Sequence, residues 1–173
     1  EIEPESRPIW TNAVDNYIPF VSREYGRNIK KDTIVFKGFK ETLWRWRDDF
    51  QNDFAARMDW SFKSFKNANH PPIPILSHSE RLTFKSGEPF RLDASNSTDP
   101  DCDNLSFLWF PYLEAGSYSS QFELGQPQNA HIAFGITPEV NKTETIHIIL
   151  KVTDKGVPPL SRYKRIIIEV NPK

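Results

Sequence analysis

The chain has 173 residues, and its 22 basic and 23 acidic side chains nearly cancel to a net charge of −1. This balance leaves no basic surplus to bind nucleic acid and no polybasic run to favour a membrane surface. No apolar run approaches the roughly 20 residues of a membrane-spanning helix. We therefore expect neither nucleic acid nor a membrane as partner. The acidic, polar start is unlike a signal peptide and lacks Met, so we expect a processed or excised chain.

The first third of the chain is irregular except for one predicted helix over about residues 38–60. Within it, apolar side chains recur at steps of three and four, the spacing of one helix face. They are Phe39, Leu43, Trp46, Phe50, Phe54 and Met58. Charged side chains are expected on the opposite side, namely Arg45, Asp48, Asp49, Asp53 and Arg57. Because so wide an aromatic stripe must be buried, we expect this helix to dock on a large surface. That surface is either the rest of this chain or an absent partner.

A proline-rich segment at residues 69–74 ends the helical pattern. Beyond it, apolar and polar side chains alternate in short runs separated by turn residues, which predicts about five to seven short strands. The clearest runs are Leu82/Phe84, Phe90/Leu92, Leu105/Phe107/Trp109, His131/Ala133, Ile146/Ile148/Leu150/Val152 and Ile166/Ile168/Val170. We therefore predict a mainly β fold: an Ig-like antiparallel β-sandwich over 70–173, preceded by an irregular segment with one amphipathic helix over 1–69.

Carboxylates gather in one predicted turn, where Asp99, Asp101 and Asp103 alternate. Asp154 follows a strand on another loop, and we expect it at the same end of the sandwich. Calcium takes six to eight oxygen ligands at about 2.3–2.6 Å, and alternate carboxylates on a bent loop supply several. These four aspartates are therefore the candidate metal site, with calcium as its ion. The alternative is a solvated turn whose aspartates cap their own backbone.

Aromatic side chains gather just after the strand that ends at Trp109. We expect Trp109 itself in the core, because it shares a strand face with Leu105 and Phe107. The candidate carbohydrate-binding residues are Phe110, Tyr112, Glu114 and Tyr118. Flat exposed rings pack against the apolar faces of sugars, and a carboxylate accepts bonds from hydroxyls. We expect Phe110 and Tyr112 to be exposed; the alternative is that they contact the N-terminal segment.

The sandwich region resembles the PKD and cadherin-like domains of secreted proteins. The resemblance lies in L-D-A-S-N-S-T-D-P-D-C-D-N-L-S-F-L-W at Leu92–Trp109 and in V-T-D-K-G-V-P-P-L at Val152–Leu160. It implies the fold and, as one hypothesis, a calcium-stiffened spacer or adhesion module. Cys102 stands where that motif usually has glycine, which questions the usual tight turn. As the single cysteine, Cys102 also excludes an intramolecular disulfide.

A second resemblance extends over nearly the whole chain. It is carried by P-I-W-T-N-A at Pro8–Ala13, R-W-R-D-D-F-Q-N-D-F-A-A-R-M-D-W at Arg45–Trp60, A-N-H-P-P at Ala68–Pro72 and W-F-P-Y-L-E-A-G-S-Y at Trp109–Tyr118. These segments resemble the C-terminal region of a bacterial family of cellulose-binding proteins with a nucleoside-hydrolase-like N-terminal domain. The resemblance implies a secreted, periplasmic or surface-attached protein, with residues 1–69 as the tail of that preceding domain.

No catalytic constellation is discernible in the sequence, because no serine or cysteine nucleophile has a matching base. The aspartate motif that nucleoside hydrolases use to hold calcium is not matched by Asp48, Asp49 and Asp53. We read His70, which precedes two prolines, as structural. Three hypotheses follow. The first is a non-catalytic accessory module that binds plant-type polysaccharide, the second a part that completes the active site of a hydrolase-like enzyme, and the third the calcium-stiffened spacer.

Overall fold

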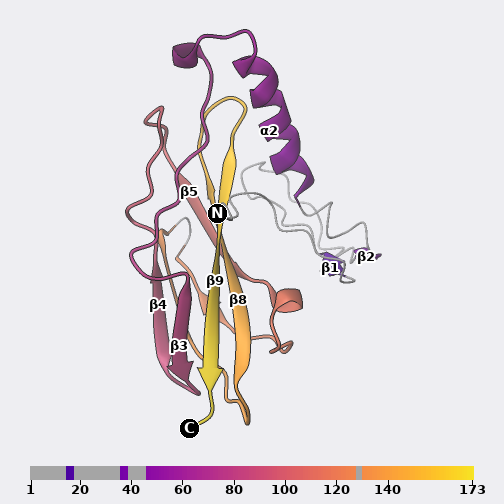
Figure 1. The fold of residues 1–173 in the computed structure, drawn as a ribbon, viewed down its shortest axis with the longest axis vertical. Coiled ribbons are helices and arrows are strands. Elements are labelled where there is room, and N and C mark those ends of the chain that lie inside the picture. The colour runs from indigo at the N-terminus through magenta and orange to yellow at the C-terminus, as the bar shows by residue number, and fades with distance from the viewer. Residues whose placement is uncertain (1–14, 18–35, 39–45, 128–129) are drawn as a thin grey trace, which may run out of the picture.

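The computed structural model describes residues 15–17, 36–38, 46–127 and 130–173. Its strands form a two-layer sandwich, with one helix beside one end of it and the C-terminus at the other end (Figure 1). A four-stranded sheet has the order β3-β9-β8-β5, and a three-stranded sheet has the order β4-β7-β6. The predicted mainly β sandwich is confirmed.

The strands of the sandwich lie where the alternating runs predicted them, and one short strand was not predicted. They are β3 (Arg81–Lys85), β4 (Pro89–Asp93), β5 (Ser106–Pro111), β6 (Leu124–Gly125), β7 (Ile132–Ile136), β8 (Glu144–Thr153) and β9 (Ser161–Asn171). The unpredicted strand is β6, which is too short to show alternation. All pairs are antiparallel except β3 with β9, which is parallel. A parallel pair is possible here because a long stretch of chain, rather than a tight turn, connects β3 to β9.

The main core lies between the two sheets and contains the residues that alternation assigned to it. Its buried members include Leu92 of β4, Ala133 of β7, Trp109 of β5, Ile148 of β8 and Ile168 of β9. Trp109 is therefore a core residue, as predicted. Since side chains on a strand alternate between its two faces, the residues between these point outward. That outer face of the four-stranded sheet has a second layer of packing.

The helix α2 (Arg47–Trp60) packs on this outer face. Trp46, immediately before it, is buried with Phe110, Tyr112, Ile149 and Tyr163 in a second, smaller core. The helix was predicted to dock on a large surface, and this chain's own sandwich provides part of that surface. Gly38 lies in β2 (Phe36–Gly38), which pairs with β1 (Asp15–Tyr17), so the helix does not begin at residue 38 as predicted. Phe39 and Leu43 of the predicted stripe lie outside the described residues.

Past α2 the chain returns to the sandwich through a short 3-10 turn, η2 (Phe65–Asn67), and the proline-rich segment. This segment lies along the sandwich and is held by hydrogen bonds. Ile73 and Thr98 form an isolated antiparallel bridge, with N···O distances of 2.8 and 3.1 Å. Ser77 adds a bond to the carbonyl of Asp93. The C-terminal end of α2 and the acidic turn are therefore brought together at one end of the sandwich.

Candidate functional site

The four residues predicted to bind carbohydrate do not form one exposed platform. Phe110 and Tyr112 are buried, so the expectation that they are exposed is wrong. The physical reason is the helix: the Trp46 ring lies 5.9 Å from that of Phe110, within the second core. The alternative, contact with the N-terminal segment, is what the structure shows. Glu114 is exposed on η3 (Leu113–Ala115), while Tyr118 packs partly buried against the main core.

The acidic turn uses its carboxylates on the backbone and on a neighbouring histidine. Oδ1 of Asp99 accepts the backbone N–H of Asp101 at 2.8 Å and that of Asp103 at 3.2 Å. Cys102 adopts a left-handed φ of 63°, the conformation that glycine takes most easily. The tight turn is therefore formed, although cysteine stands at the position where the motif usually has glycine. Asp101 accepts the backbone N–H of His70 at 2.6 Å and contacts its ring Nδ1 at 3.0 Å.

Asp154 lies at the same end of the sandwich, as expected, but it is buried in its own loop. It accepts the backbone N–H groups of Gly156 at 2.9 Å and Leu160 at 3.0 Å, and the Asn69 amide at 3.2 Å. Burial raises the pKa of Asp154, these hydrogen bonds oppose the rise, and the nearby Asp99 carboxylate adds to it. Within the described residues, no group of three or more His, Cys, Asp or Glu side chains is placed to hold a metal ion. Calcium at these aspartates stays a prediction.

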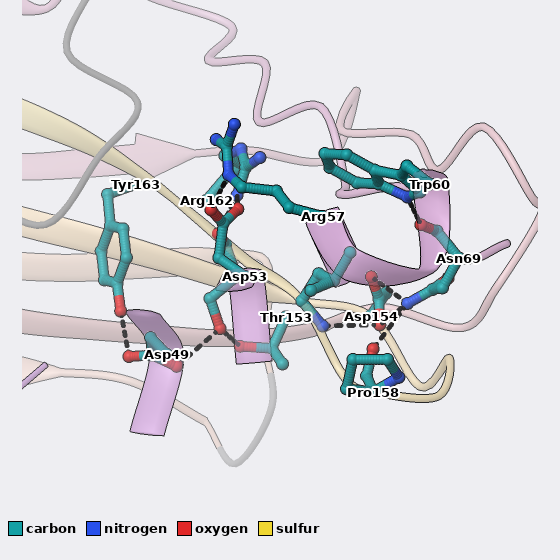
Figure 2. Close-up of polar contacts among 12 residues, drawn as sticks. Asp49, Asp53, Arg57, Trp60, Asn69, Thr153, Asp154, Pro158, Arg162 and Tyr163 are labelled. Atoms are coloured by element: carbon teal, nitrogen blue, oxygen red, sulfur yellow. Dashed lines mark hydrogen bonds and ion pairs between the residues drawn. The ribbon is translucent and has the colours of Figure 1, made fainter. Parts of the chain in front are cut away.

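The helix and the sandwich are joined by a network of polar side chains (Figure 2). At its centre, Asp49 of α2 accepts two bonds from Nζ of Lys151, both at 2.7 Å, and one from the Ser161 hydroxyl at 2.9 Å. The Tyr163 hydroxyl also donates to Asp49. Burial, and next the charge of Asp49, raise the pKa of Tyr163 well above its usual range, so the phenol stays protonated and remains a donor. One carboxylate thus holds three side chains of β8 and β9.

A second contact of the same kind lies one helical turn further on. Asp53 bonds to Arg162 of β9 at 3.1 Å and to Arg57 of its own helix at 2.7 Å (Figure 2). Asp49 and Asp53 were predicted on the side of the helix away from its docking surface, and that prediction is wrong. Helical periodicity shows that polar and apolar side chains lie on different faces, but Lys151 and Arg162, distant in sequence, attract the acidic face. We call this set of ionic contacts the junction.

Beyond the junction, three aromatic rings surround a hollow near the C-terminal end of α2. The Phe65 ring stacks on that of His70 at a centroid distance of 3.8 Å, and the Trp60 ring lies nearly parallel to His70 at 6.1 Å. Trp60 also donates its indole N–H to the carbonyl of Asn69 at 2.7 Å (Figure 2). The hollow has a volume of about 320 Å³ and is lined by Trp60, Lys63, Phe65, Ala68, His70 and Pro71. We call it the aromatic hollow.

The geometry of the aromatic hollow suits a ligand with both apolar faces and hydroxyl groups. Phe65 is 72% exposed, so one face of its ring is open to a ligand. Because Nδ1 of His70 contacts Asp101 at 3.0 Å, Nε2 is the ring nitrogen that remains to hydrogen-bond a ligand hydroxyl. Sequence reasoning missed this site because it read His70 as structural. The aspartate that orients His70 lies 31 positions away, so no local spacing shows the pair.

The function of the aromatic hollow is considered next to a search for membrane-spanning helices and three comparisons with known proteins. Within the described residues, no helix has the length and apolar character needed to cross a membrane. Residues 89–170 match a family model described as cellulose-binding protein Sde0182, C-terminal domain. No match was found among curated proteins.

A solved structure from Saccharophagus degradans is similar over nearly the whole chain. It is described as a nucleoside hydrolase-related hypothetical protein associated with carbohydrate metabolism. The two share 31% sequence identity with a TM-score of 0.70, and the match covers 93% of this chain and 40% of that one. This chain therefore spans less than half the length of that structure. The second resemblance drawn from the sequence, to cellulose-binding proteins with a nucleoside-hydrolase-like domain, is confirmed. Over residues 89–170, the chain is similar to the C-terminal domain of cellulose-binding protein Sde0182.

Proposed function

We propose that this chain is a non-catalytic accessory module of a hydrolase-related protein and that it binds cellulose-like polysaccharide. The family description and the carbohydrate association of the S. degradans protein support the ligand class. They also support a location outside the cell or at its surface, where such a polysaccharide is met. In this proposal residues 1–69 adjoin a preceding hydrolase-like domain, and the sandwich of residues 70–173 supports the binding site.

The observation that carries the proposal is the aromatic hollow. A glucan ring has apolar C–H faces and equatorial hydroxyls, so it needs an aromatic face beside polar groups. Phe65 supplies the face, Nε2 of His70 forms a hydrogen bond with a sugar hydroxyl, and Lys63 donates from the rim. Because Asp101 and the Phe65 ring already hold His70 in place, little side-chain entropy is lost on binding. The hollow thus takes over the role that the sequence suggested for Phe110 and Tyr112.

Pull-down on insoluble cellulose tests this proposal. We expect the wild-type chain to be depleted from the supernatant and Phe65→Ala to bind about tenfold more weakly, since an apolar ring contact of ~1.4 kcal/mol is lost. Phe134→Ala is the matched control, because Phe134 is also exposed but lies on β7 of the three-stranded sheet and does not line the aromatic hollow. We expect this control to bind like the wild type.

Two outcomes would contradict the proposal. One is a wild-type chain that stays wholly in the supernatant. The other is a Phe65→Ala variant that binds as well as the Phe134→Ala control. Circular dichroism of each variant separates a loss of binding from a loss of fold, which we do not expect at these exposed positions.

A further inference from the structure

The side of α2 that does not face the sandwich carries a line of large apolar side chains. Phe54, Met58 and Phe62 follow one another at steps of four, the spacing that places residues above one another on a helix. The turn continues past Trp60, because the backbone N–H of Lys63 bonds to the carbonyl of Asp59 at 2.8 Å. The side chains are 65%, 52% and 71% exposed, respectively. We call these three residues the outer ridge.

The outer ridge cannot turn inward, because the junction holds the opposite side of the helix. Asp49 is bonded to Lys151 and Ser161. Asp53 is bonded to Arg162 (Figure 2). Rotating the ridge toward the sandwich would break these ion pairs and leave their charges without partners. The helix is therefore fixed with its acidic side inward and the ridge outward. The inward side also carries Trp46 and Phe50, which pack in the second core.

A concavity beside the ridge gives a partner surface something to fit. It has a volume of about 620 Å³, and its described lining consists of Phe50, Gln51, Asp53, Phe54 and Arg57. The lining combines two phenylalanines with an Asp53–Arg57 ion pair at 2.7 Å. Apolar anchors with a charged rim are typical of a surface that contacts another folded domain.

We propose that the outer ridge is the docking surface for a hydrolase-like domain of the same protein. This inference rests on the proposed function, which makes the chain an accessory to such a domain. The similar S. degradans structure supports this occupant, because 93% of this chain matches only 40% of that one. The larger part of that nucleoside hydrolase-related chain thus lies outside the match. Since α2 precedes the sandwich, docking here sets the orientation of the sandwich, and with it the aromatic hollow, relative to the enzyme-like domain.

Thiol reactivity tests the docking surface directly. In a Cys102→Ser background, which removes the native thiol, Phe54→Cys reports on the ridge. Ile136→Cys is the matched control, because Ile136 is 64% exposed, against 65% for Phe54. Ile136 pairs with Pro89 in the three-stranded sheet, whereas α2 packs on the four-stranded sheet. Each variant is labelled with Ellman's reagent twice, once in this 173-residue chain and once in the longer protein that includes the hydrolase-like domain.

We expect the Phe54→Cys thiol to react at least about tenfold more slowly in the longer protein than in this chain, which corresponds to ~1.4 kcal/mol of docking free energy. The Ile136→Cys thiol should react at the same rate in both. Met58→Cys gives a second reporter on the ridge should Phe54→Cys fold poorly.

Equal rates for the Phe54→Cys thiol in the two proteins would overturn the proposal, and so would a longer protein without a hydrolase-like domain. Protection that rises with the concentration of this chain alone would also overturn it, in favour of a second copy as the occupant. Cellulose pull-down of the same variants is scored separately. A chain that binds cellulose while its ridge stays reactive refutes the docking surface alone, and a protected ridge without cellulose binding refutes only the ligand.

Discussion

The inner and outer faces of the four-stranded sheet differ in how they are packed. Between the sheets, side chains such as Ile148 and Leu150 are buried against other apolar side chains. On the outer face, the rings around Trp46 are joined to the polar junction at Asp49, Lys151 and Tyr163. Apolar burial is non-directional and stabilises the sandwich as a whole. Ion pairs and hydrogen bonds need particular partners at particular distances, so the outer face sets the orientation of the helix.

The largest expected effect comes from the inner face. We expect Leu150→Ala to lower the free energy of unfolding by about 2–5 kcal/mol, because it removes buried methyl groups and leaves a cavity between the sheets. Urea denaturation measures this loss. Val157→Ala is the control, since Val157 is exposed in a loop and should change stability by no more than about 0.5 kcal/mol. Similar losses for the two variants would show that the inner face is not the main source of stability.

A smaller loss is expected at the junction. Asp49→Ala deprives Lys151, Ser161 and Tyr163 of their shared acceptor, and we expect it to cost about 2 kcal/mol. The cost should stay below that of a fully buried ion pair, because Lys151 is partly exposed. Urea denaturation followed by tryptophan fluorescence is suitable, since Trp46 is buried beside the junction.

The neighbouring residue supplies the matched control for that experiment. Asp48 has the same side chain but is exposed, so Asp48→Ala should change stability by no more than about 0.5 kcal/mol. Equal effects of Asp48→Ala and Asp49→Ala would mean that helix charge, rather than the contact with the sandwich, is responsible.

The smallest expected effect is a pH dependence on the outer face. Burial of His147 of β8, and next the charges of Arg165 and Arg81, lower the pKa of His147. The unfolded chain then binds a proton more readily than the folded one as pH falls below about 6.5. Stability is therefore expected to fall from pH 8 to pH 5, and His147→Leu should reduce that fall. Chemical denaturation at the two pH values measures it, and an unchanged fall in the variant would exclude His147 as its source.

The sandwich could be predicted because its signal is local. Period-two alternation in residues 146–152 and 166–170 predicts which side chains are buried, and the structure confirms them. The same alternation placed Trp109 inward and, by one step, Phe110 outward. The exposure of Phe110 was predicted wrongly, because an outward side chain is exposed only if nothing covers it. Trp46, more than 60 positions earlier, covers Phe110.

The aromatic hollow could not be predicted from spacing. Trp60, Phe65 and His70 are close in sequence, but their rings meet only because the chain turns back after α2. That return is held by Asn69 on Asp154 and by His70 on Asp101. Two of the four aspartates that suggested calcium, Asp101 and Asp154, are thus anchors of the hollow in the structure.

Two kinds of information are separable in this protein. Residue order along the chain was sufficient to predict the β-sandwich, its core tryptophan and the family resemblance, because period-two burial and short motifs depend on neighbours in sequence. Tertiary structure alone decided which side of α2 faces the sandwich and where open aromatic rings remain. The reason is that a helix with one acidic and one apolar face can dock by either. The cations of Lys151 and Arg162 on β8 and β9 hold Asp49 and Asp53 against the sandwich beside Trp46 and Phe50, which leaves Phe54 and Met58 of the apolar stripe outward.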